Sequence, residues 1–569
     1  MKSHYDDPSL AIDNLFIGTI IEVDGTHIVA ELDTNIAELT RNYAGRIYPI
    51  GQFGSIIKIH FGRKLIYAYV GRLRMKSELE RQKGVAGPDL SNARVIEADL
   101  FGEGEWVHKE NEWQLQFLRG ISTYPLPQQK VYLTPSTELK YVYGGEQENT
   151  IKLGEHVGTN GTPCYADMNE LLGLHTAILG STGAGKSGTV AAILHSILER
   201  GKAVGYDEWK PQIIILDPHN EYGAAFPGHR RLSTDEDTLQ LPYWMFNLAE
   251  FTDLLVGKTE FAATSETNIV KRALLHARQQ AAIVVDQEPD SIVVDAPVPF
   301  DLNVFQRHIE DDRPTNKDGS ISSKADSHER ILRKLDVLRR DNRLRFMMAN
   351  WDGESDPFTT IASQFLGTEE PIRIVDLSGV PNEIAGAASS IVARLLFSYK
   401  VWQNSDERRN SPVLFVCEEA HRYVPNRGEA QYHAAQDAIR RIAKEGRKYG
   451  IGMFVVSQRP SEVEPTVLSQ CNSWIVLRIT NDNDRNQVRA ILPDSLAGLT
   501  KVLSGLGKRE AVFVGQAATL PSRIQIRMLE KEQLPQSHNT DFDAGWQHDS
   551  FSPKEIQIIG RRWRTQSRE

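Results

Sequence analysis

The chain has 569 residues and a formal net charge of −10, with 40% hydrophobic and 25% charged residues. This length is enough for several domain-sized cores, and the acidic balance excludes a surface that attracts nucleic acid over its whole area, so any such contact has to be local. No apolar run approaches the roughly 20 residues of a membrane span, which argues against a membrane-embedded protein. The N-terminus lacks the apolar core of a secretory signal, and the three cysteines cannot form a disulfide framework, so we expect a cytoplasmic protein.

The first 150 residues are rich in short alternating strands. Apolar and polar residues alternate in several runs between residues 14 and about 75, separated by turn residues such as Asp24-Gly25. A second β-rich stretch continues to about residue 150, and helical periodicity is scarce throughout. We therefore predict a β-barrel over residues 1–150. Nothing in it resembles a catalytic constellation, so we interpret it as an assembly or docking domain.

A phosphate-binding loop follows the apolar run at residues 177–179. Its glycines allow successive N–H groups to point at phosphate oxygens, and the helix-compatible run after the loop adds the partial positive charge of a helix N-terminus. Lys186 is expected to reach the β- and γ-phosphates, and the hydroxyl of Ser187 to bind Mg²⁺. The sequence therefore predicts that the chain binds a nucleoside triphosphate. The predicted contacts are Gly180, Ser181, Thr182, Gly183, Ala184, Gly185, Lys186, Ser187 and Gly188.

From about residue 171, short apolar strands alternate with helical segments, which indicates a largely parallel sheet of the α/β type. We predict that residues 151–245 and 346–530 form this core, that residues 246–345 are a helical insertion, and that residues 531–569 are a C-terminal extension. Ligands gather at the carboxyl ends of parallel strands. Polar motifs at the ends of these strands are therefore candidate site residues.

The predicted insertion carries a basic run that has two interpretations. One is contact with DNA, and the commoner one is a solvated helix face on which basic residues alternate with Asp336 and Asp341. The C-terminal RRWRTQSRE is also basic, and it is either a mobile tail or a binding arm. The basic run of the insertion consists of Arg333, Lys334, Arg339, Arg340, Arg343 and Arg345.

The apolar strand predicted at residues 413–417 ends in two acidic residues, which is the Walker B pattern. Hydrolysis of a nucleoside triphosphate needs a carboxylate that holds Mg²⁺ and a group that activates the attacking water. Glu418 takes the metal position, and Glu419 takes the water-activating position. An Asp is usual where Glu418 stands, and the longer side chain either shifts the metal or requires a bridging water.

Two further strand ends carry polar motifs. The motif DPHNEY at residues 217–222 can position water or a phosphate, and we count Asp217 and Glu221 among the candidate nucleotide contacts. For Glu221 and His219, a turn that is hydrogen-bonded to itself is the competing interpretation. Gln458 ends a later strand and is suited to sense a γ-phosphate through a hydrogen bond.

The helical stretch at residues 440–448 carries several guanidinium groups without obvious partners in the sequence. The charge that develops on a phosphoryl group in the transition state is stabilised by an arginine that a neighbouring subunit can supply. One of these arginines is therefore a candidate for such a trans-acting finger.

Together these motifs resemble the HerA family of hexameric DNA-translocating ATPases, within the larger group of FtsK-type DNA pumps and type IV secretion ATPases. The N-terminal barrel is similar to the family's HAS-barrel. The core motifs HTAILGSTGAGKS, DPHNEY, EEAH, KEGRKYGIG and SQRP also match, as does the stretch at residues 503–526. The resemblance implies a RecA-like P-loop core, a homohexameric ring, ATP bound between subunits and double-stranded DNA threaded through the centre.

The resemblance also implies a role for individual residues. By position, Lys186 and Ser187 hold phosphate and Mg²⁺, Glu419 activates water and Gln458 senses the γ-phosphate. Arg447 is the first choice for the trans-acting finger, and Arg441 is the second.

Relatives in the HerA family act with a separate nuclease in DNA end processing, and others with nuclease or sirtuin-like NAD-consuming effectors in antiphage defence. This sequence carries no nuclease signature of its own, so we expect the effector to be another chain docked on the barrel. Two hypotheses follow: a motor that moves DNA, and a nucleotide-gated ring scaffold that regulates an effector without processive translocation. The absence of a membrane anchor disfavours a third, a protein-pumping secretion ATPase.

Overall fold

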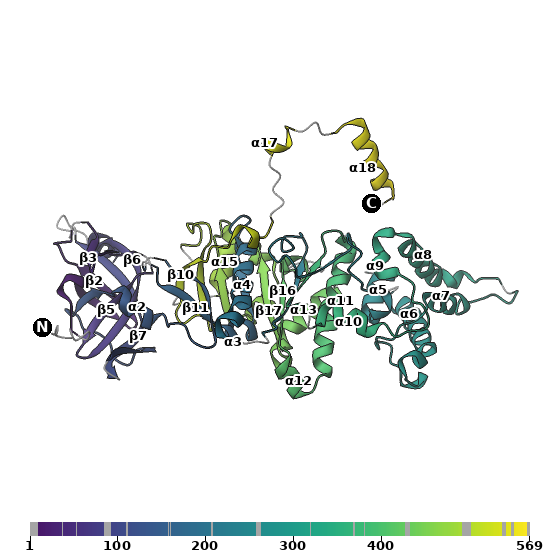
Figure 1. Ribbon diagram of the computed structural model, residues 1–569, viewed down its shortest axis with the longest axis horizontal. Helices are drawn as coiled ribbons and strands as arrows, with labels where there is room; N and C mark the ends of the chain where they lie inside the picture. The colour runs from purple at the N-terminus through teal and green to yellow at the C-terminus, as the bar shows by residue number, and fades with distance from the viewer. Residues whose placement is uncertain are drawn as a thin grey trace. The chain divides into compact units, whose positions relative to one another are not determined.

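In the computed structural model, the chain forms two compact units. Figure 1 labels the helices and strands of the chain. The first comprises Met1–Leu171, Gly180–Gly185 and Ser473–Met528, and the second comprises Leu172–Leu179, Lys186–Asn472 and Leu529–Glu569. The domain boundaries predicted at residues 150, 245, 345 and 530 stay predictions. The structure describes residues 10–36, 38–52, 54–82, 84, 93–109, 112–157, 159, 161–205, 209–257, 263–318, 320–367, 370–380, 382–426, 433–491, 502–536, 542–547 and 551–565.

A closed barrel of six antiparallel strands forms the N-terminal part of the first unit, as predicted. The strand order is β2-β1-β9-β5-β6-β7, and β2 closes the barrel because it pairs with both β1 and β7. The strands are β1 (Phe16–Asp24), β2 (His27–Leu32), β5 (Ile56–Phe61), β6 (Lys64–Met75), β7 (Arg94–Lys109) and β9 (Lys130–Leu133). Smaller elements are η1 (Asp13–Leu15), the β3 (Thr40–Tyr43) and β4 (Arg46–Pro49) hairpin, α1 (Lys76–Gln82), and β8 (Glu112–Arg119), which pairs with β7 outside the barrel.

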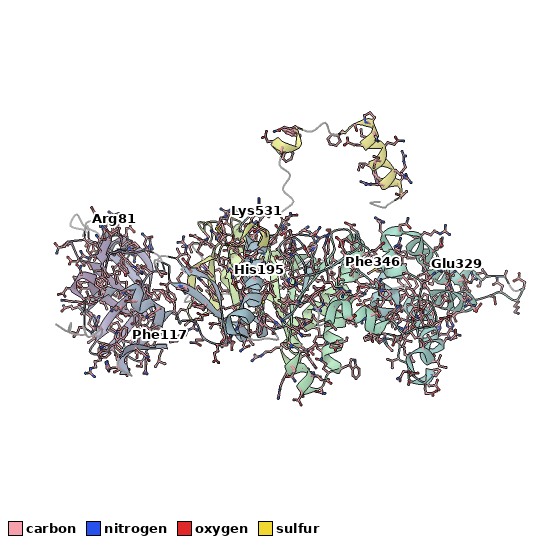
Figure 2. The ribbon with its side chains drawn as sticks, viewed as in Figure 1. Arg81, Phe117, His195, Glu329, Phe346 and Lys531 are labelled. Atoms are coloured by element: carbon pink, nitrogen blue, oxygen red, sulfur yellow. The ribbon has the colours of Figure 1, made fainter. Side chains whose placement is uncertain are left out.

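A buried ionic cluster holds α2 (Ser136–Val142) to the barrel. Lys58, Tyr67 and Glu138 are all at most 2% exposed. The Lys58 Nζ atom lies 2.6 Å from Glu138 Oε2, and the Tyr67 hydroxyl donates to Glu138 Oε1 at 2.5 Å. Removing one partner of a buried pair leaves an uncompensated charge and costs roughly 3–5 kcal/mol. Phe117, labelled in Figure 2, packs edge-on against the Tyr67 ring and extends this cluster toward β8.

An antiparallel section of sheet completes the first unit. Its order is β11-β10-β20-β19-β18, and it packs on the barrel through Leu520, which contacts the cluster that contains Leu139 and Val142. The Tyr143 ring also stacks on His156, with 3.6 Å between ring centroids. The strands are β10 (Thr150–His156), β11 (Pro163–Asp167), β18 (Ser473–Val476), β19 (Glu510–Gly515) and β20 (Ser522–Ile526), and α15 (Asp482–Ile491) belongs to the same unit.

A parallel sheet forms the core of the second unit. Its order is β12-β17-β16-β13-β15-β14, and every neighbouring pair is parallel. Strands β12, β15, β16 and β17 are buried at every position, as expected for a sheet covered on both faces. The predicted α/β core is therefore confirmed. The strands are β12 (Thr176–Leu179), β13 (Gln212–Asp217), β14 (Arg230–Ser233), β15 (Ile372–Asp376), β16 (Val413–Cys417) and β17 (Ile451–Ser457).

Helices fill the rest of the second unit, including the predicted insertion. Buried Arg278 ties two of its segments together by donating to the carbonyls of Trp244 and Phe246, and Glu250 pairs with Arg394 at 2.7 Å. The helices are α4 (Lys186–Val204), α5 (Leu248–Leu255), α6 (Ala263–Gln280), α7 (Leu302–Asp311), α8 (Asp326–Arg340), α9 (Arg345–Met348), α10 (Phe358–Leu366), α11 (Asn382–Trp402), α12 (Ser405–Asn410), α13 (His433–Glu445), α14 (Pro465–Ser469), α17 (Phe542–Gly545) and α18 (Pro553–Thr565); α3 (Met168–Gly173) spans the boundary between the units.

Three of the six residues in the basic run of the insertion are paired with acidic neighbours. Arg340 lies 3.0 Å from Asp336, Arg343 lies 2.6 Å from Asp341, and Arg345 lies 3.1 Å from Asp237. This pairing favours the solvated-face interpretation over DNA contact. At the C-terminus, the basic residues up to Thr565 end helix α18, and residues 566–569 lie outside the described residues.

One helix within the described ranges, Ile384–Trp402 of α11, is long and apolar enough to cross a membrane by length and composition alone. Inside the structure, 72% of that window is buried, and α11 packs against α13. These are the properties of a core helix. All three cysteines, Cys164, Cys417 and Cys471, are buried, and none of them forms a disulfide.

We predict that His156 makes the first unit less stable in mild acid. Burial lowers the pKa of His156 to about 3, so the folded state stays neutral while the unfolded chain takes up a proton below its ordinary pKa of about 6.5. Its contribution to stability is present above pH 6.5 and is lost as the pH falls toward 3, by about 2 kcal/mol at pH 5. His156→Phe keeps a ring beside Tyr143, so its urea midpoint should change less than that of the wild type between pH 7 and pH 5. Tyr143→Phe is the control that retains the wild-type slope, and equal slopes in all three proteins would contradict the assignment.

Candidate functional site

The phosphate-binding loop is held by the segment that follows β18. The amide of Ser181 donates to the carbonyl of Arg478 at 2.9 Å, and the Ser181 hydroxyl accepts from the amide of Thr480 at 3.2 Å. Gly183 and Gly185 have φ angles of 73° and 103°, which L-residues with side chains rarely adopt. A Cβ atom at Gly180 would lie 2.9 Å from Cβ of Leu477. The glycines predicted for phosphate binding are therefore also required by the backbone of the loop.

Lys186 and Ser187 occupy the first turn of α4, after the buried strand β12 and the loop. This is the strand–loop–helix arrangement expected of a phosphate-binding loop. Lys186 is only 7% exposed, and its charge lowers the pKa of Glu418, so the ammonium group and this carboxylate act on one another.

Glu418 is 2% exposed and follows the last residue of β16. Its Oε2 atom accepts a hydrogen bond from the hydroxyl of Tyr222 at 2.6 Å, and no other hydrogen bond reaches its side chain among the described residues. Burial is the main cause that raises the pKa of Glu418 to about 8, and the nearby charge of Glu419 adds to it. A carboxylate in this setting needs a cation to stay ionised at neutral pH.

Glu419 has two features that are typical of a functional residue. Its backbone is in the left-handed conformation with φ 51° and ψ 48°, which costs energy for a side chain of this type and is common at active sites. Its Oε2 atom is buried without a hydrogen-bond partner, although Nδ1 of His421 lies 3.2 Å away. The same Nδ1 atom lies 3.2 Å from the hydroxyl of Ser457, and burial lowers the pKa of His421. The structure thus places an unsatisfied carboxylate oxygen beside a neutral imidazole.

The loop at residues 217–222 is folded around the carboxylate of its first residue, Asp217. Asp217 is fully buried, and its two oxygens accept from the amides of His219 at 3.2 Å and Tyr222 at 2.9 Å. Burial raises the pKa of Asp217 to about 6, against the effect of these amides. Asp217 therefore shapes the turn, while His219 is exposed and Glu221 is half-buried. The carbonyl of Glu221 accepts from the amide of Gln536, so the start of the C-terminal extension contacts this loop.

The candidate arginines differ in how they are held. Arg440 pairs with Glu464 at 2.9 Å, and Arg441 lies over the Phe397 ring at 4.4 Å from its centroid. Arg447 is exposed in the turn η8 (Gly446–Tyr449), and its guanidinium makes no hydrogen bond or ion pair with the described residues.

Arg447 and Gln458 lie at opposite ends of β17. The seven residues of this strand span roughly 20 Å. Gln458 is half-buried at the carboxyl end, near the Ser457 hydroxyl that contacts His421. Arg447 is therefore remote from Glu418 and Glu419 of the same chain, as the prediction of a trans-acting residue requires.

The residues present fit a nucleotide-bound Mg²⁺. The described residues hold no cluster of three or more His, Cys, Asp or Glu that could hold a metal ion by themselves. Mg²⁺ is usually held by one or two protein groups together with substrate phosphates. The free oxygen of Glu418 and the hydroxyl of Ser187 are suited to that role, and the orphaned oxygen of Glu419 is suited to a water.

The structure adds residues that the sequence had not marked as part of the site. Tyr222 ends the motif DPHNEY, but only the fold brings its hydroxyl to Glu418. His421 and Ser457 belong to the motifs EEAH and SQRP, and their contact is likewise set by the pairing of β16 with β17.

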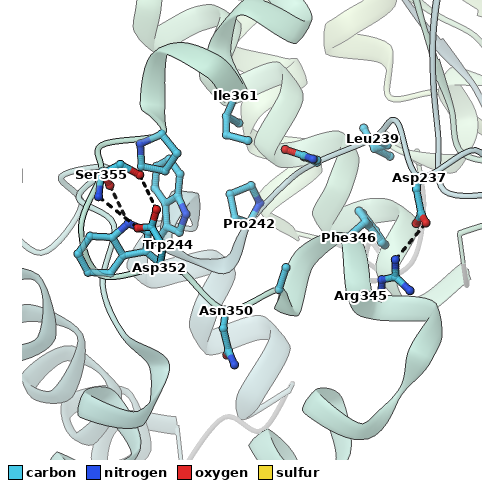
Figure 3. A pocket seen from close by; sticks show the side chains of 14 residues that line it. Asp237, Leu239, Pro242, Trp244, Arg345, Phe346, Asn350, Asp352, Ser355 and Ile361 are labelled. Atoms are coloured by element: carbon cyan, nitrogen blue, oxygen red, sulfur yellow. Dashed lines mark hydrogen bonds and ion pairs between the residues drawn. The ribbon is translucent and has the colours of Figure 1, made fainter.

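A pocket of about 440 Å³ lies elsewhere in the second unit (Figure 3). Trp244, Trp351 and Pro242 contribute to its lining, which includes none of the predicted site residues. Its charged groups are satisfied within the chain, because Arg345 pairs with Asp237 and Asp352 accepts from the hydroxyl of Ser355. This pocket is therefore separate from the nucleotide chemistry.

Comparison with known proteins identifies the domain that carries the phosphate-binding loop and the loop at residues 217–222. Residues 151–396 match the family model of the central domain of the helicase HerA. The chain carries a HerA central domain. The resemblance to the HerA family that the motifs predicted is thereby confirmed, and the chain is a P-loop ATPase.

Individual relatives and solved structures match a larger part of the chain. The chain is 26% identical over 433 residues to the DNA double-strand break repair helicase HerA of Pyrococcus furiosus. This match covers 70% of this chain and 72% of the relative. It is 28% identical over 408 residues to the protein of the same name from Saccharolobus solfataricus, with 70% and 72% covered. Among solved structures, VirB4 of Thermoanaerobacter pseudethanolicus matches with a TM-score of 0.45 at 16% identity, over 68% of this chain and 99% of that one.

We predict that Glu419→Gln lowers kcat for ATP hydrolysis roughly 10²–10⁴-fold, because the amide keeps the size of the side chain and cannot take up the proton of water. Binding of a fluorescent ATP analogue should stay within about twofold of the wild type. Glu329→Gln is the control, since Glu329 pairs with Arg313 at 2.9 Å in the predicted insertion and should leave hydrolysis unchanged. A raised KM with an unchanged kcat in Glu419→Gln would contradict a role in water activation.

Proposed function

We propose that the chain couples ATP hydrolysis to the movement of double-stranded DNA through a homohexameric ring. The observation that carries this proposal is the buried pair Glu418 and Glu419 at the end of β16, in a chain whose residues 151–396 match a HerA central domain. The relatives named DNA double-strand break repair helicases support DNA as the molecule that is moved.

In this proposal each protein group has a distinct task at the nucleotide. The loop amides and Lys186 bind the phosphates of ATP, while Ser187 and Glu418 hold Mg²⁺. The metal, when bound, offsets negative charge on the phosphates. Glu419 takes the proton of the attacking water, and Gln458 donates to the γ-phosphate. Asp217 keeps the loop at residues 217–222 folded, which leaves Glu221 as the group of that loop that can face the nucleotide.

The place of Arg447 supports the proposed ring. Its guanidinium is exposed at the end of β17 that is opposite the carboxylates and has no partner among the described residues, so in this proposal it stabilises transition-state charge in a neighbouring subunit. Arg441 is a weaker candidate, because its guanidinium already lies over the Phe397 ring.

We further propose that the barrel docks a separate nuclease or NAD-consuming effector, in DNA end processing or in antiphage defence. The barrel part of the chain carries several exposed apolar side chains that a docked partner would bury, which supports this proposal. They are Ile47, Leu118, Tyr124 and Leu126, each at least 50% exposed. The alternative is a ring that regulates such an effector without processive translocation.

We predict that linear duplex DNA stimulates ATP hydrolysis by the purified chain, and that Lys186→Ala lowers kcat/KM at least about 100-fold because phosphate charge loses its partner. DNA binding should weaken steeply between 50 and 200 mM salt, as expected when phosphates are contacted by basic groups. Hydrolysis is measured by phosphate release, with and without DNA.

A protein roadblock fixed on the same DNA separates the motor from the scaffold. A translocating ring displaces the roadblock, whereas a scaffold hydrolyses ATP and leaves it in place. Normal hydrolysis by Lys186→Ala would show that the nucleotide site is wrongly assigned.

We predict that Arg447→Ala lowers kcat roughly 10³-fold or more, and that part of the activity returns on mixing with Lys186→Ala. In mixed rings, a Lys186→Ala subunit supplies its intact Arg447 to a neighbour whose own nucleotide site is intact. The measurement is ATP hydrolysis of the mixture against the sum of the separate proteins. Arg441→Ala in the same assay is the comparison, and recovery with Arg441→Ala alone would assign the finger to Arg441.

A further inference from the structure

Tyr222 connects the two polar strand ends of the second unit. It is fully buried, its amide donates to Asp217 Oδ2 at 2.9 Å, and its hydroxyl donates to Glu418 Oε2 at 2.6 Å. The residue is thus fixed at its backbone by one buried carboxylate and at its hydroxyl by another. Asp217 follows Leu216 on β13, which lies opposite Cys417 on β16. Both carboxylates therefore leave adjacent strands at the same edge.

The hydrogen bond matters because a glutamate stands where an aspartate is usual. A glutamate side chain has one more rotatable bond than an aspartate, so its carboxylate can occupy more positions. The Tyr222 hydroxyl lies 2.6 Å from Glu418 Oε2, and its hydrogen bond to this oxygen strengthens when a bound cation ionises the carboxyl group. This bond occupies Oε2 and leaves Oε1 without a donor among the described residues.

We propose that Tyr222 is a positioning residue that holds Glu418 in one rotamer, with Oε1 free to hold the Mg²⁺ of bound ATP. The inference rests on the proposed ATPase site. Tyr222 touches neither nucleotide nor metal, and it acts through Glu418 alone. The pair Tyr222 and Glu418 thus replaces the shorter aspartate as a unit.

The geometry makes the two residues interdependent. Shortening Glu418 by one methylene in Glu418→Asp withdraws the carboxylate by about 1.5 Å, which lengthens the 2.6 Å contact beyond hydrogen-bond distance. The Tyr222 hydroxyl then no longer reaches the carboxylate and cannot position it. Tyr222→Phe should therefore affect Mg²⁺ binding with Glu418 present and not with Asp at that position.

The test is a double-mutant cycle on the full-length chain with two readouts of metal binding. The first is the Mg²⁺ concentration at half-maximal ATP hydrolysis. The second is the Mg²⁺ concentration at half-maximal fluorescence change of bound N-methylanthraniloyl-ADP, which needs no turnover. Wild type, Tyr222→Phe, Glu418→Asp and the double variant are compared.

Tyr243→Phe is the matched control. Tyr243 is also fully buried, and its hydroxyl donates to the carbonyl of Phe300 at 2.6 Å, away from the nucleotide residues. It should lower the thermal midpoint about as much as Tyr222→Phe and leave both Mg²⁺ midpoints unchanged.

We expect Tyr222→Phe to raise both Mg²⁺ midpoints about tenfold in the wild-type background and less than twofold in the Glu418→Asp background. Unchanged midpoints in Tyr222→Phe, or equal shifts in both backgrounds, would overturn the positioning role while the ATPase assignment stands. A wild-type chain that binds the ADP analogue without dependence on Mg²⁺ would overturn the assignment and this inference together.

Discussion

The parallel pairing of β13 with β16 is the constraint on which the candidate site depends. In this register Leu216 lies opposite Cys417, so Asp217 and Glu418 emerge from adjacent strands at one edge. The neighbouring pairs continue the pattern, since Asp217 lies opposite Asp376 on β15 and Cys417 lies opposite Val455 on β17. Three acidic strand ends therefore converge in a fully buried setting, where each needs compensation.

The carboxylates differ in the ion pairs and hydrogen bonds that compensate for their burial. We use this difference to distinguish proposed structural roles from proposed chemical roles. Asp376 is neutralised by the guanidinium of Arg231 at 2.7 Å, and Asp217 is satisfied by amides of its own loop. Glu418 accepts one hydrogen bond, from the neutral phenol of Tyr222. Glu419 has a buried oxygen that accepts no hydrogen bond from the described residues. In the proposed function, the carboxylates with complete compensation shape the edge, while those with incomplete compensation bind ligands. An incompletely satisfied carboxylate is tolerated in a native fold where a bound group completes it.

The candidate catalytic groups also lie at two opposite edges of the parallel sheet, one strand length apart. The carboxylates and Gln458 lie at the carboxyl edge of the sheet, whereas Arg447 lies before β17 at the other edge. In the proposed function, one subunit provides the phosphate loop, the metal carboxylate and the water-activating carboxylate, whereas Arg447 lies too far along β17 to reach them. Assembly into a ring would supply this arginine, so ATP hydrolysis would depend on contact between subunits.

The sequence by itself determined the elements of this protein and the chemistry at their ends. Alternation of apolar residues predicted the N-terminal barrel, and apolar strands between helices predicted the parallel core, because burial on one face or two leaves a local pattern. The glycine spacing before Lys186 and the paired acids at Glu418 and Glu419 predicted a P-loop ATPase, since such chemistry needs neighbouring residues of fixed type. Only the tertiary structure decided which distant side chains meet. It placed the Tyr222 hydroxyl on Glu418 across 196 residues, gave the bonds of Asp217 to its own loop, and paired Arg340, Arg343 and Arg345 with acidic residues. Such contacts depend on strand register and helix packing, which no local pattern of residues encodes.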